Sequence, residues 1–344
     1  MNNFAWMITT STNNIGDDFQ CIAAKYFLPK NADKIMIDRE QMNTYSGKKV
    51  NLIANGWYMH HPENWPPSKD ISPLLTSIHI SNVRQRNGKI PMNYMFSKDS
   101  IEYMKKHSPI GCRDIFTYKM LQKKGIPSYF SGCMTLTLRT RRTQRKDYIC
   151  LVDPSKELED FVKEKTKREV VIVRPEKKDW PVDYKQRIGE AEKILQVYAN
   201  AHMVITGRLH GALPSLAMGT PVLLLTGKFG DERYEGLKYF LNYAVLSDLY
   251  QGKYPIDFEN PMENPQEYLV VKNNLEKIVI SYIKGNKSKL DFEKIHDENI
   301  EAMNRAKKRT IDFYRKNNLY SIKVHEFMSN IRYKCRTIEN KFNL

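Results

Sequence analysis

The chain has 344 residues, of which 41% are hydrophobic and 11% aromatic, so it can bury sizeable cores and exceeds the usual size of one domain. This composition excludes a disordered chain and favours two domains. The net charge of +16 suits nucleic acid, an anionic membrane surface or a phosphorylated small molecule, but it also suits a chain that is simply rich in lysine, so charge alone selects no function.

Apolar strand patterns alternate with helical patterns through the first 138 residues. Ser100 and Asp114 are suitable N-caps for two of these helices, and Gly125 is a suitable stop signal. The predicted strands lie at 4–9, 34–37, 50–54, 77–80, 109–112 and 126–138, and the predicted helices at 19–27, 101–107 and 115–124.

The same alternation restarts after the basic segment 139–146, which we interpret as a solvated linker. The predicted strands are 148–152, 169–173, 202–206 and 221–225, and the helices 157–165, 184–199 and 208–219. Repeated alternation predicts two Rossmann-like α/β domains, at 1–140 and 147–284, followed by a basic helical extension at 285–344. Ligands of such sheets bind outside the carboxyl ends of the strands, which in a paired arrangement face an interdomain cleft.

The five cysteines are scattered and none forms a CxxC pair, which argues against a disulfide framework and against a zinc site. The amino-terminal residues 1–19 lack a basic region followed by an apolar one, and no apolar run approaches the roughly 20 residues that span a bilayer. We therefore expect a cytoplasmic protein without a metal ion.

The junction at 206–210 joins a buried strand to a helix through Gly207, Arg208, Leu209 and His210. The first-turn N–H groups of that helix and the Arg208 guanidinium would together suit an anion. In the alternative interpretation, Arg208 pairs with a structural carboxylate and His210 is a hydrogen-bonded residue in a packed turn. The GRLHG run matches neither the dinucleotide fingerprint nor the P-loop, so spacing alone leaves both readings open.

Three segments resemble the polysaccharide pyruvyltransferase family. ITGRLHGALPSLAMGTPVLLL (205–225) is similar to the segment in which that family carries an RLH tripeptide before a G-x-P turn. NNIGDDFQCIAA (13–24) resembles its N-x-GD element, and IGCRDIFTYKMLQKKGI (110–126) resembles its central block. The chain departs from many relatives at 131–138, SGCMTLTL, where they have Asp-Pro, and this bears on the acceptor more than on the donor.

The resemblance implies a two-domain transferase of GT-B-like arrangement that forms a pyruvate ketal on a sugar, with phosphoenolpyruvate as donor and no cofactor. It implies donor contacts from Gly207, Arg208, Leu209 and His210, with Arg113 of the other domain as the second arginine. Two guanidinium groups suit the adjacent phosphate and carboxylate of this donor, because each can bind bidentately.

Proton transfer in ketal formation requires a group that titrates near neutral pH, and His210 is the best candidate. The positive end of the helix dipole should keep its imidazole neutral near pH 7. Asp17 and Asp18 can accept a proton from a sugar hydroxyl or hold its position, or one of them caps a helix. Further candidates for acceptor or phosphate contacts, each with exposure or packing as the alternative, are His60, Trp57, Lys228, Arg233 and Glu235.

Two other functions fit the pattern less closely. A glycosyltransferase of similar architecture would hold the diphosphate of a nucleotide sugar at Arg208. A non-catalytic binder of phosphate or nucleic acid is suggested by charge alone, and the chain lacks a basic and aromatic recognition motif, so we expect no nucleic acid partner. The acceptor glycan is expected to be a cell-surface polysaccharide or its lipid-linked precursor. The basic helical pattern at 295–316 fits three roles equally: crossing back to the first domain, peripheral contact with an anionic membrane, or packing between molecules.

Overall fold

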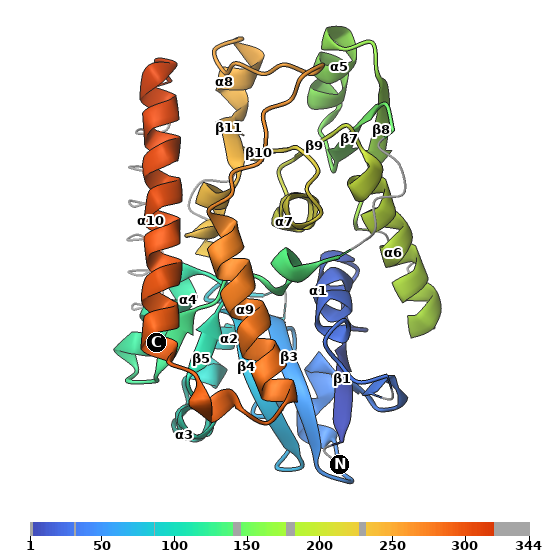
Figure 1. The fold of residues 1–344 in the computed structure, drawn as a ribbon. Helices are drawn as coiled ribbons and strands as arrows, with labels where there is room; N and C mark the ends of the chain where they lie inside the picture. The colour runs from blue at the N-terminus through green and yellow to red at the C-terminus, as the bar shows by residue number, and fades with distance from the viewer. Residues whose placement is uncertain are drawn as a thin grey trace.

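The structure is a computed structural model that describes residues 3–30, 32–85, 87–139, 146–176, 183–226 and 232–319. Within these ranges the chain forms two parallel sheets, one in each half of the molecule (Figure 1). The first has the order β2-β1-β3-β4-β5-β6 and the second the order β11-β10-β9-β7-β8. The architecture is therefore mixed α/β, as the alternating strands and helices predict.

The first sheet uses residues up to Phe130. Its strands are β1 (Phe4–Ile8), β2 (Met36–Asp38), β3 (Val50–Tyr58), β4 (Ile71–Ile80), β5 (Ile110–Cys112) and β6 (Ser128–Phe130), with helices α1 (Gly16–Lys25), α2 (Pro91–Met95), α3 (Lys98–Lys106) and α4 (Ile115–Lys123). Asp114 caps α4 as predicted, accepting from the Thr117 N–H at 2.9 Å, whereas Ser97 and not Ser100 caps α3. The expected strand at 126–138 is wrong beyond Phe130, since Gly132 has a φ of +68° and residues Met134–Thr137 form a 3-10 turn.

The second sheet begins at Tyr148. Its strands are β7 (Tyr148–Val152), β8 (Glu169–Val173), β9 (Met203–Thr206), β10 (Val222–Thr226) and β11 (Asn242–Val245), with helices α5 (Lys156–Lys165), α6 (Tyr184–Asn200), α7 (Leu209–Ala217) and α8 (Leu246–Tyr250). The strands are continuous apolar runs because helices cover a parallel sheet on both faces. Of the predicted basic linker, residues 140–145 lie outside the described part of the chain.

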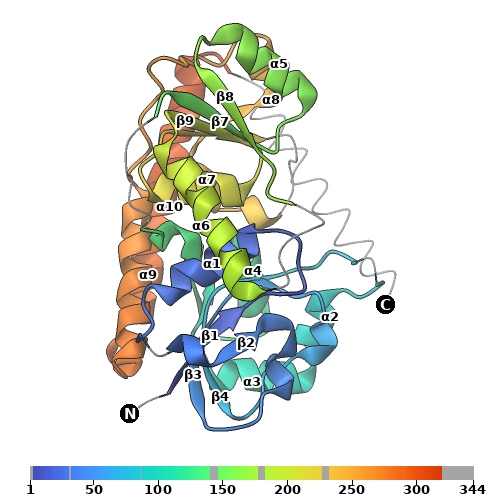
Figure 2. The same cartoon turned by 90° about the vertical axis from the view of Figure 1, so that its right-hand side faces the viewer.

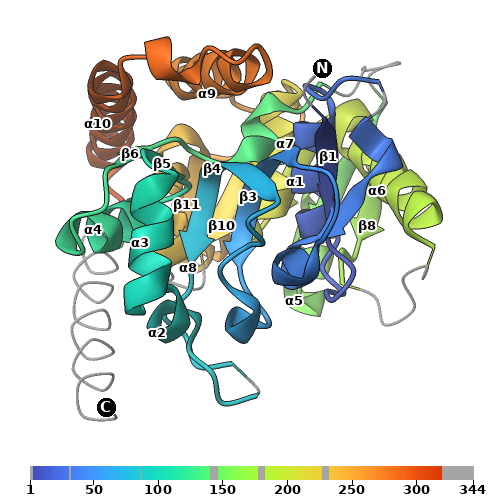
Figure 3. The same cartoon turned by 90° about the horizontal axis from the view of Figure 1, so that it is seen from below.

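Two long helices, α9 (Tyr268–Ile283) and α10 (Phe292–Lys316), run along one side of both sheets, opposite α2 and α3 (Figures 1 and 3). The Tyr282 hydroxyl of α9 donates to the Ser72 carbonyl of β4 at 2.6 Å. Asn299 of α10 donates to the Phe130 carbonyl at 2.7 Å, and Tyr314 of the same helix donates to the Tyr243 carbonyl at 2.7 Å. The carboxyl-terminal helices therefore join the two halves.

A buried ion pair also joins the halves where α1 meets α6 (Figure 2). The Arg187 guanidinium donates to both carboxylate oxygens of Asp18, at 2.7 to 2.9 Å, and the two side chains are 5% and 0% exposed. Within the described residues, no helix is both long enough and apolar enough to cross a membrane.

We predict that Arg187→Gln lowers the free energy of unfolding by about 3 to 5 kcal/mol, because the Asp18 carboxylate would remain buried without its cation. The double variant Asp18→Asn with Arg187→Gln should lose less free energy of unfolding than the two single variants lose in sum, because it leaves no unpaired buried charge. Urea denaturation measures both.

The control is Lys193→Gln, which removes an exposed ion pair with Glu190 on the same helix. It should change the free energy of unfolding by no more than about 0.5 kcal/mol. Equal losses in Arg187→Gln and in the control would contradict a structural role for the buried pair.

Candidate functional site

Two strand-to-helix junctions from different sheets touch between the halves, where β1 leads into α1 and β9 leads into α7 (Figures 1 and 2). Gly16 is the first residue of α1, and a Cβ atom placed there would lie 2.1 Å from Nδ1 of His210. Only glycine permits this approach. The junctions that the sequence singles out therefore form one site, between the carboxyl ends of the strands of both sheets.

His210 lies in the first turn of α7 and is partly buried. Burial, reinforced by the positive charges of Arg113, Arg233 and Arg208, lowers the pKa of His210 to about 3, although Asp17 acts in the opposite direction. The neutral imidazole expected from the sequence is thus supported, but burial and guanidinium charge are its causes, rather than the helix dipole alone. At pH 7 the imidazole of His210 is therefore unprotonated in the unliganded protein.

Arg208 is the N-cap residue of α7, and no side chain in the described part of the chain caps this helix, which is also the case for α1, α2, α8 and α9. Its guanidinium is 31% exposed and contacts Asp153 Oδ2 at 2.6 Å and Glu176 Oε1 at 2.8 Å. The alternative interpretation of Arg208, pairing with carboxylates, is therefore what this structure contains. Its contact with a donor stays a prediction.

Arg113 follows β5 and is 2% exposed. Its Nε lies 3.7 Å from Asp114 Oδ2 and has no hydrogen-bond partner among the described residues. The same carboxylate oxygen lies 2.7 Å from His79 Nδ1, so Asp114 orients both neighbours while it caps α4. The structure brings Arg113 near His210, as its effect on the pKa of that histidine shows.

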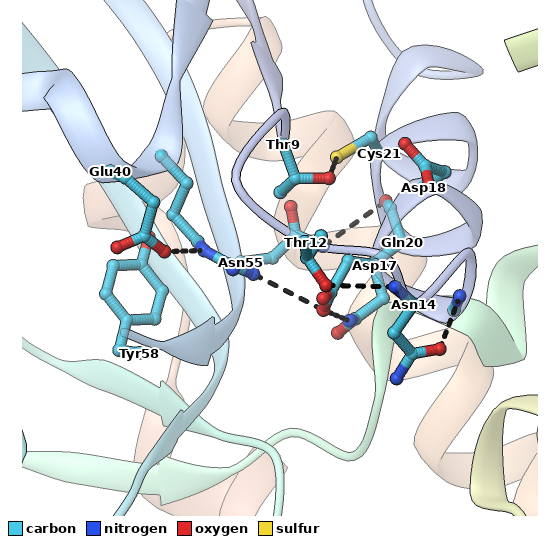
Figure 4. A network of polar contacts seen from close by, with 12 residues as sticks. Thr9, Thr12, Asn14, Asp17, Asp18, Gln20, Cys21, Glu40, Asn55 and Tyr58 are labelled. Carbon is cyan, nitrogen blue, oxygen red and sulfur yellow. Dashed lines mark hydrogen bonds and ion pairs between the residues drawn. The ribbon is translucent and has the colours of Figure 1, made fainter. Parts of the chain in front are cut away.

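Asp17 lies in a buried polar network at the carboxyl end of the first sheet (Figure 4). Arg39 Nη1 donates to Asp17 Oδ1 at 3.3 Å, and Arg39 Nε donates to Glu40 Oε1 at 2.9 Å. Burial would raise the pKa of Asp17, but the positive charge of Arg39 holds it below its ordinary value. Asp17 is therefore a carboxylate beside the neutral imidazole of His210.

Asp18 points elsewhere, although it is adjacent in sequence. Both of its oxygens accept from Arg187, in the ion pair that joins the two halves. Burial raises the pKa of Asp18 to about 6, against the lowering effect of Arg187. The structure thus places Asp17 with His210 and places Asp18 in the contact between α1 and α6.

Trp57 and His60 lie at the end of β3, with ring centroids 4.7 Å apart. Burial, followed by the positive charge of Arg39, lowers the pKa of His60. The adjacent His61 N–H donates to Glu40 Oε2 at 2.8 Å, which ties this loop to the network around Arg39. These predicted acceptor-side residues therefore lie at the same edge of the sheet as Asp17.

Of the remaining candidate residues, some lie near His210 and others make structural contacts. Arg233 is exposed and close enough to act on the pKa of His210. The Glu235 carboxylate accepts from Lys119 at 2.5 Å, so this side chain links the halves. Leu209 is buried, the Gly207 carbonyl accepts from a tyrosine hydroxyl at 2.6 Å, and Lys228 lies outside the described residues.

Sequence reasoning missed several charged partners: Arg39, Glu40, His79, Asp153, Glu176 and Arg187. Arg39 and Asp153 are the first residues after β2 and β7, and Arg113 likewise follows β5. A search for charged residues directly after the predicted strands would have identified Asp153, because parallel strands end at one edge of a sheet. Among the described residues, no three His, Cys, Asp or Glu side chains are grouped so that they could hold a metal ion.

Two parallel sheets with a histidine, arginines and a carboxylate between their strand ends define an α/β protein with a site suited to an anionic ligand. The family model of polysaccharide pyruvyl transferases matches residues 14–228, and this chain belongs to that family, as the resemblance of its three segments predicts. The family makes the protein a transferase of polysaccharide biosynthesis.

A comparison with curated proteins gives no match. Among solved structures, the chain is similar to one from Klebsiella pneumoniae subsp. pneumoniae NTUH-K2044, described as a functional uncharacterized protein. The two are 12% identical, the similarity covers 71% of this chain and 93% of the other, and the TM-score is 0.44.

We predict that Gly16→Ala displaces His210 or separates α1 from α7, because the new methyl group would overlap the imidazole. The free energy of unfolding should fall by about 1 to 3 kcal/mol. Thermal and urea denaturation test this.

Gly189→Ala is the matched control, since it lies inside α6 and a Cβ there meets nothing within 4 Å. Alanine has a higher helix propensity than glycine, so the free energy of unfolding of this variant should rise by up to about 1 kcal/mol. If the two alanine variants behaved alike, the close contact of Gly16 would not constrain the fold.

A second prediction concerns the pH dependence of stability. An unfolded histidine binds a proton below about pH 6.5, whereas folded His210 has a pKa of about 3. Between these values the unfolded chain binds the extra proton, so His210 makes the protein less stable as the pH falls, by up to about 1.4 kcal/mol per pH unit.

His210→Gln lacks this contribution. Relative to wild type, the variant should therefore gain about 2 kcal/mol of stability between pH 7 and pH 5, measured by urea denaturation at each pH. If the free energies of unfolding of wild type and His210→Gln changed with pH in the same way, the pKa of His210 would be the same in the folded and the unfolded chain.

Proposed function

We propose that the protein transfers pyruvate from phosphoenolpyruvate to two hydroxyls of a sugar, as a cyclic ketal, on a cell-surface polysaccharide or its lipid-linked precursor. One observation carries the proposal. A neutral His210 with the guanidinium groups of Arg113 and Arg208 around it lies where the strand ends of the two sheets meet. Family membership supports the reaction class.

In this proposal, the donor binds at the amino end of α7. Arg208 and the first-turn backbone N–H groups of Leu209 and His210 would bind one anionic group of phosphoenolpyruvate, beside Gly207, and Arg113 would bind the other. The absence of a side-chain cap on α7 in the described structure supports this, since a cap would compete with the anion.

The reaction takes one proton from each of two hydroxyls. One proton goes to the methylene carbon of the donor, two C–O bonds form at the adjacent carbon, and the bond from that carbon to the phosphate oxygen breaks, so inorganic phosphate leaves with the second proton. We assign the first transfer to His210, because a weakly basic imidazole that has accepted a hydroxyl proton becomes a strong acid toward carbon. The ionised Asp17 would orient the hydroxyl and stabilise the imidazolium.

The sugar would approach from the first sheet, where Trp57 and His60 lie beside the Arg39 network. The domain division at residues 140–147, a GT-B-like arrangement with the donor on the second domain, and action at the inner face of the plasma membrane all belong to this proposal. So does a reaction without a metal ion or cofactor. Family membership does not favour the alternative, a glycosyltransferase that uses a nucleotide sugar.

The test is incubation of the purified protein with phosphoenolpyruvate and a panel of pyranosides that offer neighbouring hydroxyl pairs. We expect phosphate release that depends on the acceptor, and an acceptor mass increased by one pyruvate ketal. Turnover of nucleotide sugars with no reaction of phosphoenolpyruvate would contradict the proposal.

We predict that His210→Gln lowers kcat by about 100-fold or more at saturating donor, because glutamine keeps a polar group but cannot transfer a proton. Arg208→Ala should instead weaken donor binding, by about 10- to 100-fold, through loss of a charge-assisted contact. Steady-state kinetics and calorimetric titration with phosphoenolpyruvate separate the two effects.

The control is His107→Gln, at the end of α3, whose ring packs on Tyr103. Its kinetics should match those of wild type. If His210→Gln kept its kcat and only bound the donor more weakly, His210 would be a ligand, and proton transfer would pass to Asp17.

A further inference from the structure

Four charged side chains form a cluster at the carboxyl ends of three neighbouring strands, β8, β7 and β9. Arg208 follows β9 and contacts Asp153 Oδ2 at 2.6 Å and Glu176 Oε1 at 2.8 Å. Arg174 follows β8 and lies 3.7 Å from Asp153 Oδ1. Two carboxylates thus contact Arg208, the arginine that binds the donor in the proposed function.

The two carboxylates differ in how firmly the fold holds them. Asp153 has a left-handed backbone with a φ of +54°, its N–H donates to the Val173 carbonyl at 2.8 Å, and two arginines contact its side chain. Left-handed backbone in a residue other than glycine is kept only where the surroundings impose it. Asp153 is therefore a fixed partner that sets the direction of the Arg208 guanidinium.

Glu176 is held differently. Its backbone bridges to Asn14 in the loop before α1, but its side chain is 56% exposed, and Arg208 is its ion-pair partner within the described structure. An exposed pair of this kind contributes little stability, because water solvates both charges well. The Glu176 carboxylate can therefore separate from Arg208 at a low cost in free energy. The Asp153 carboxylate is held in place by its backbone and by two arginines.

We propose that Glu176 is a competing anion that occupies one face of Arg208 until the donor displaces it, while Asp153 positions the guanidinium. The proposal rests on the proposed function, since it takes Arg208 as a donor contact. A donor with both phosphate and carboxylate can displace Glu176, because it offers Arg208 more negative charge than a single carboxylate does.

The test is calorimetric titration of phosphoenolpyruvate and of pyruvate into wild type, Glu176→Gln and Asp153→Asn. We expect Glu176→Gln to bind phosphoenolpyruvate about two- to fivefold more tightly, because the donor no longer displaces an ion pair. The affinity for pyruvate should rise by no more than the same factor, because either ligand would displace the same ion pair. Asp153→Asn should bind phosphoenolpyruvate more weakly, because Arg208 loses its orientation.

Glu164→Gln is the matched control, since it removes one exposed carboxylate from α5, where Glu164 pairs with Lys165. It changes the net charge by the same amount and should leave both affinities unchanged. Thermal denaturation confirms that each variant is folded.

Unchanged or weaker donor binding by Glu176→Gln, or equal tightening in Glu164→Gln, would overturn the inference while leaving the proposed function intact. Failure of wild type to bind phosphoenolpyruvate would contradict the proposed function and the inference together. The two failures are therefore distinguishable from the wild-type titration alone.

Discussion

The contact between Gly16 and His210 is the constraint on which the arrangement of the site depends. It brings the first turn of α1 against the first turn of α7, so that Asp17 and the imidazole share one region. Gly16 is required here for space, since it lies within a helix. The same loop ties the halves together a second time, because Asn14 bridges to Glu176 and the Ile15 N–H donates to the Pro175 carbonyl at 3.1 Å. Site and interface are therefore built from the same few residues.

Buried charge surrounds this contact, and nearly every described charge there has a partner. Asp18 is paired with Arg187, Asp17 with Arg39, and Asp114 with His79. Such pairs add little net stability, because desolvation offsets their attraction, but breaking one leaves a costly lone charge. Of these three pairs, that of Asp18 with Arg187 joins the halves and so excludes other relative positions of them. Arg113 is paired with Asp114 at 3.7 Å, but its buried Nε has no hydrogen-bond partner in the described structure, as is also true of Arg39 Nη2. Such an atom is suited to bind a ligand.

The strand-helix alternation predicted most of the fold, because parallel strands covered on both sides are apolar along their whole length. The strand at 148–152 and the cap at Asp114 are confirmed. The strand that starts at Ile71 was expected only from residue 77, since Ser72 and Pro73 interrupt its apolar pattern. In the site, Arg113, Asp17 and His210 were found from motifs, whereas Asp153 and Glu176 were missed. Their contact with Arg208 depends on the order of strands in the sheet, which differs from their order in the chain.

The charges around His210 also indicate how donor binding would prepare it for proton transfer. In the unliganded protein, burial and the positive charges of Arg113, Arg233 and Arg208 make its imidazole a weak base. A bound dianion would neutralise those guanidinium groups and would therefore raise the pKa of His210 toward the range in which it can accept a hydroxyl proton. Displacement of Glu176 from Arg208 by the donor would leave that balance unchanged, because one anion replaces another. The change at His210 would thus come mainly from Arg113, which lowers the pKa of this histidine more than Arg233 or Arg208 does.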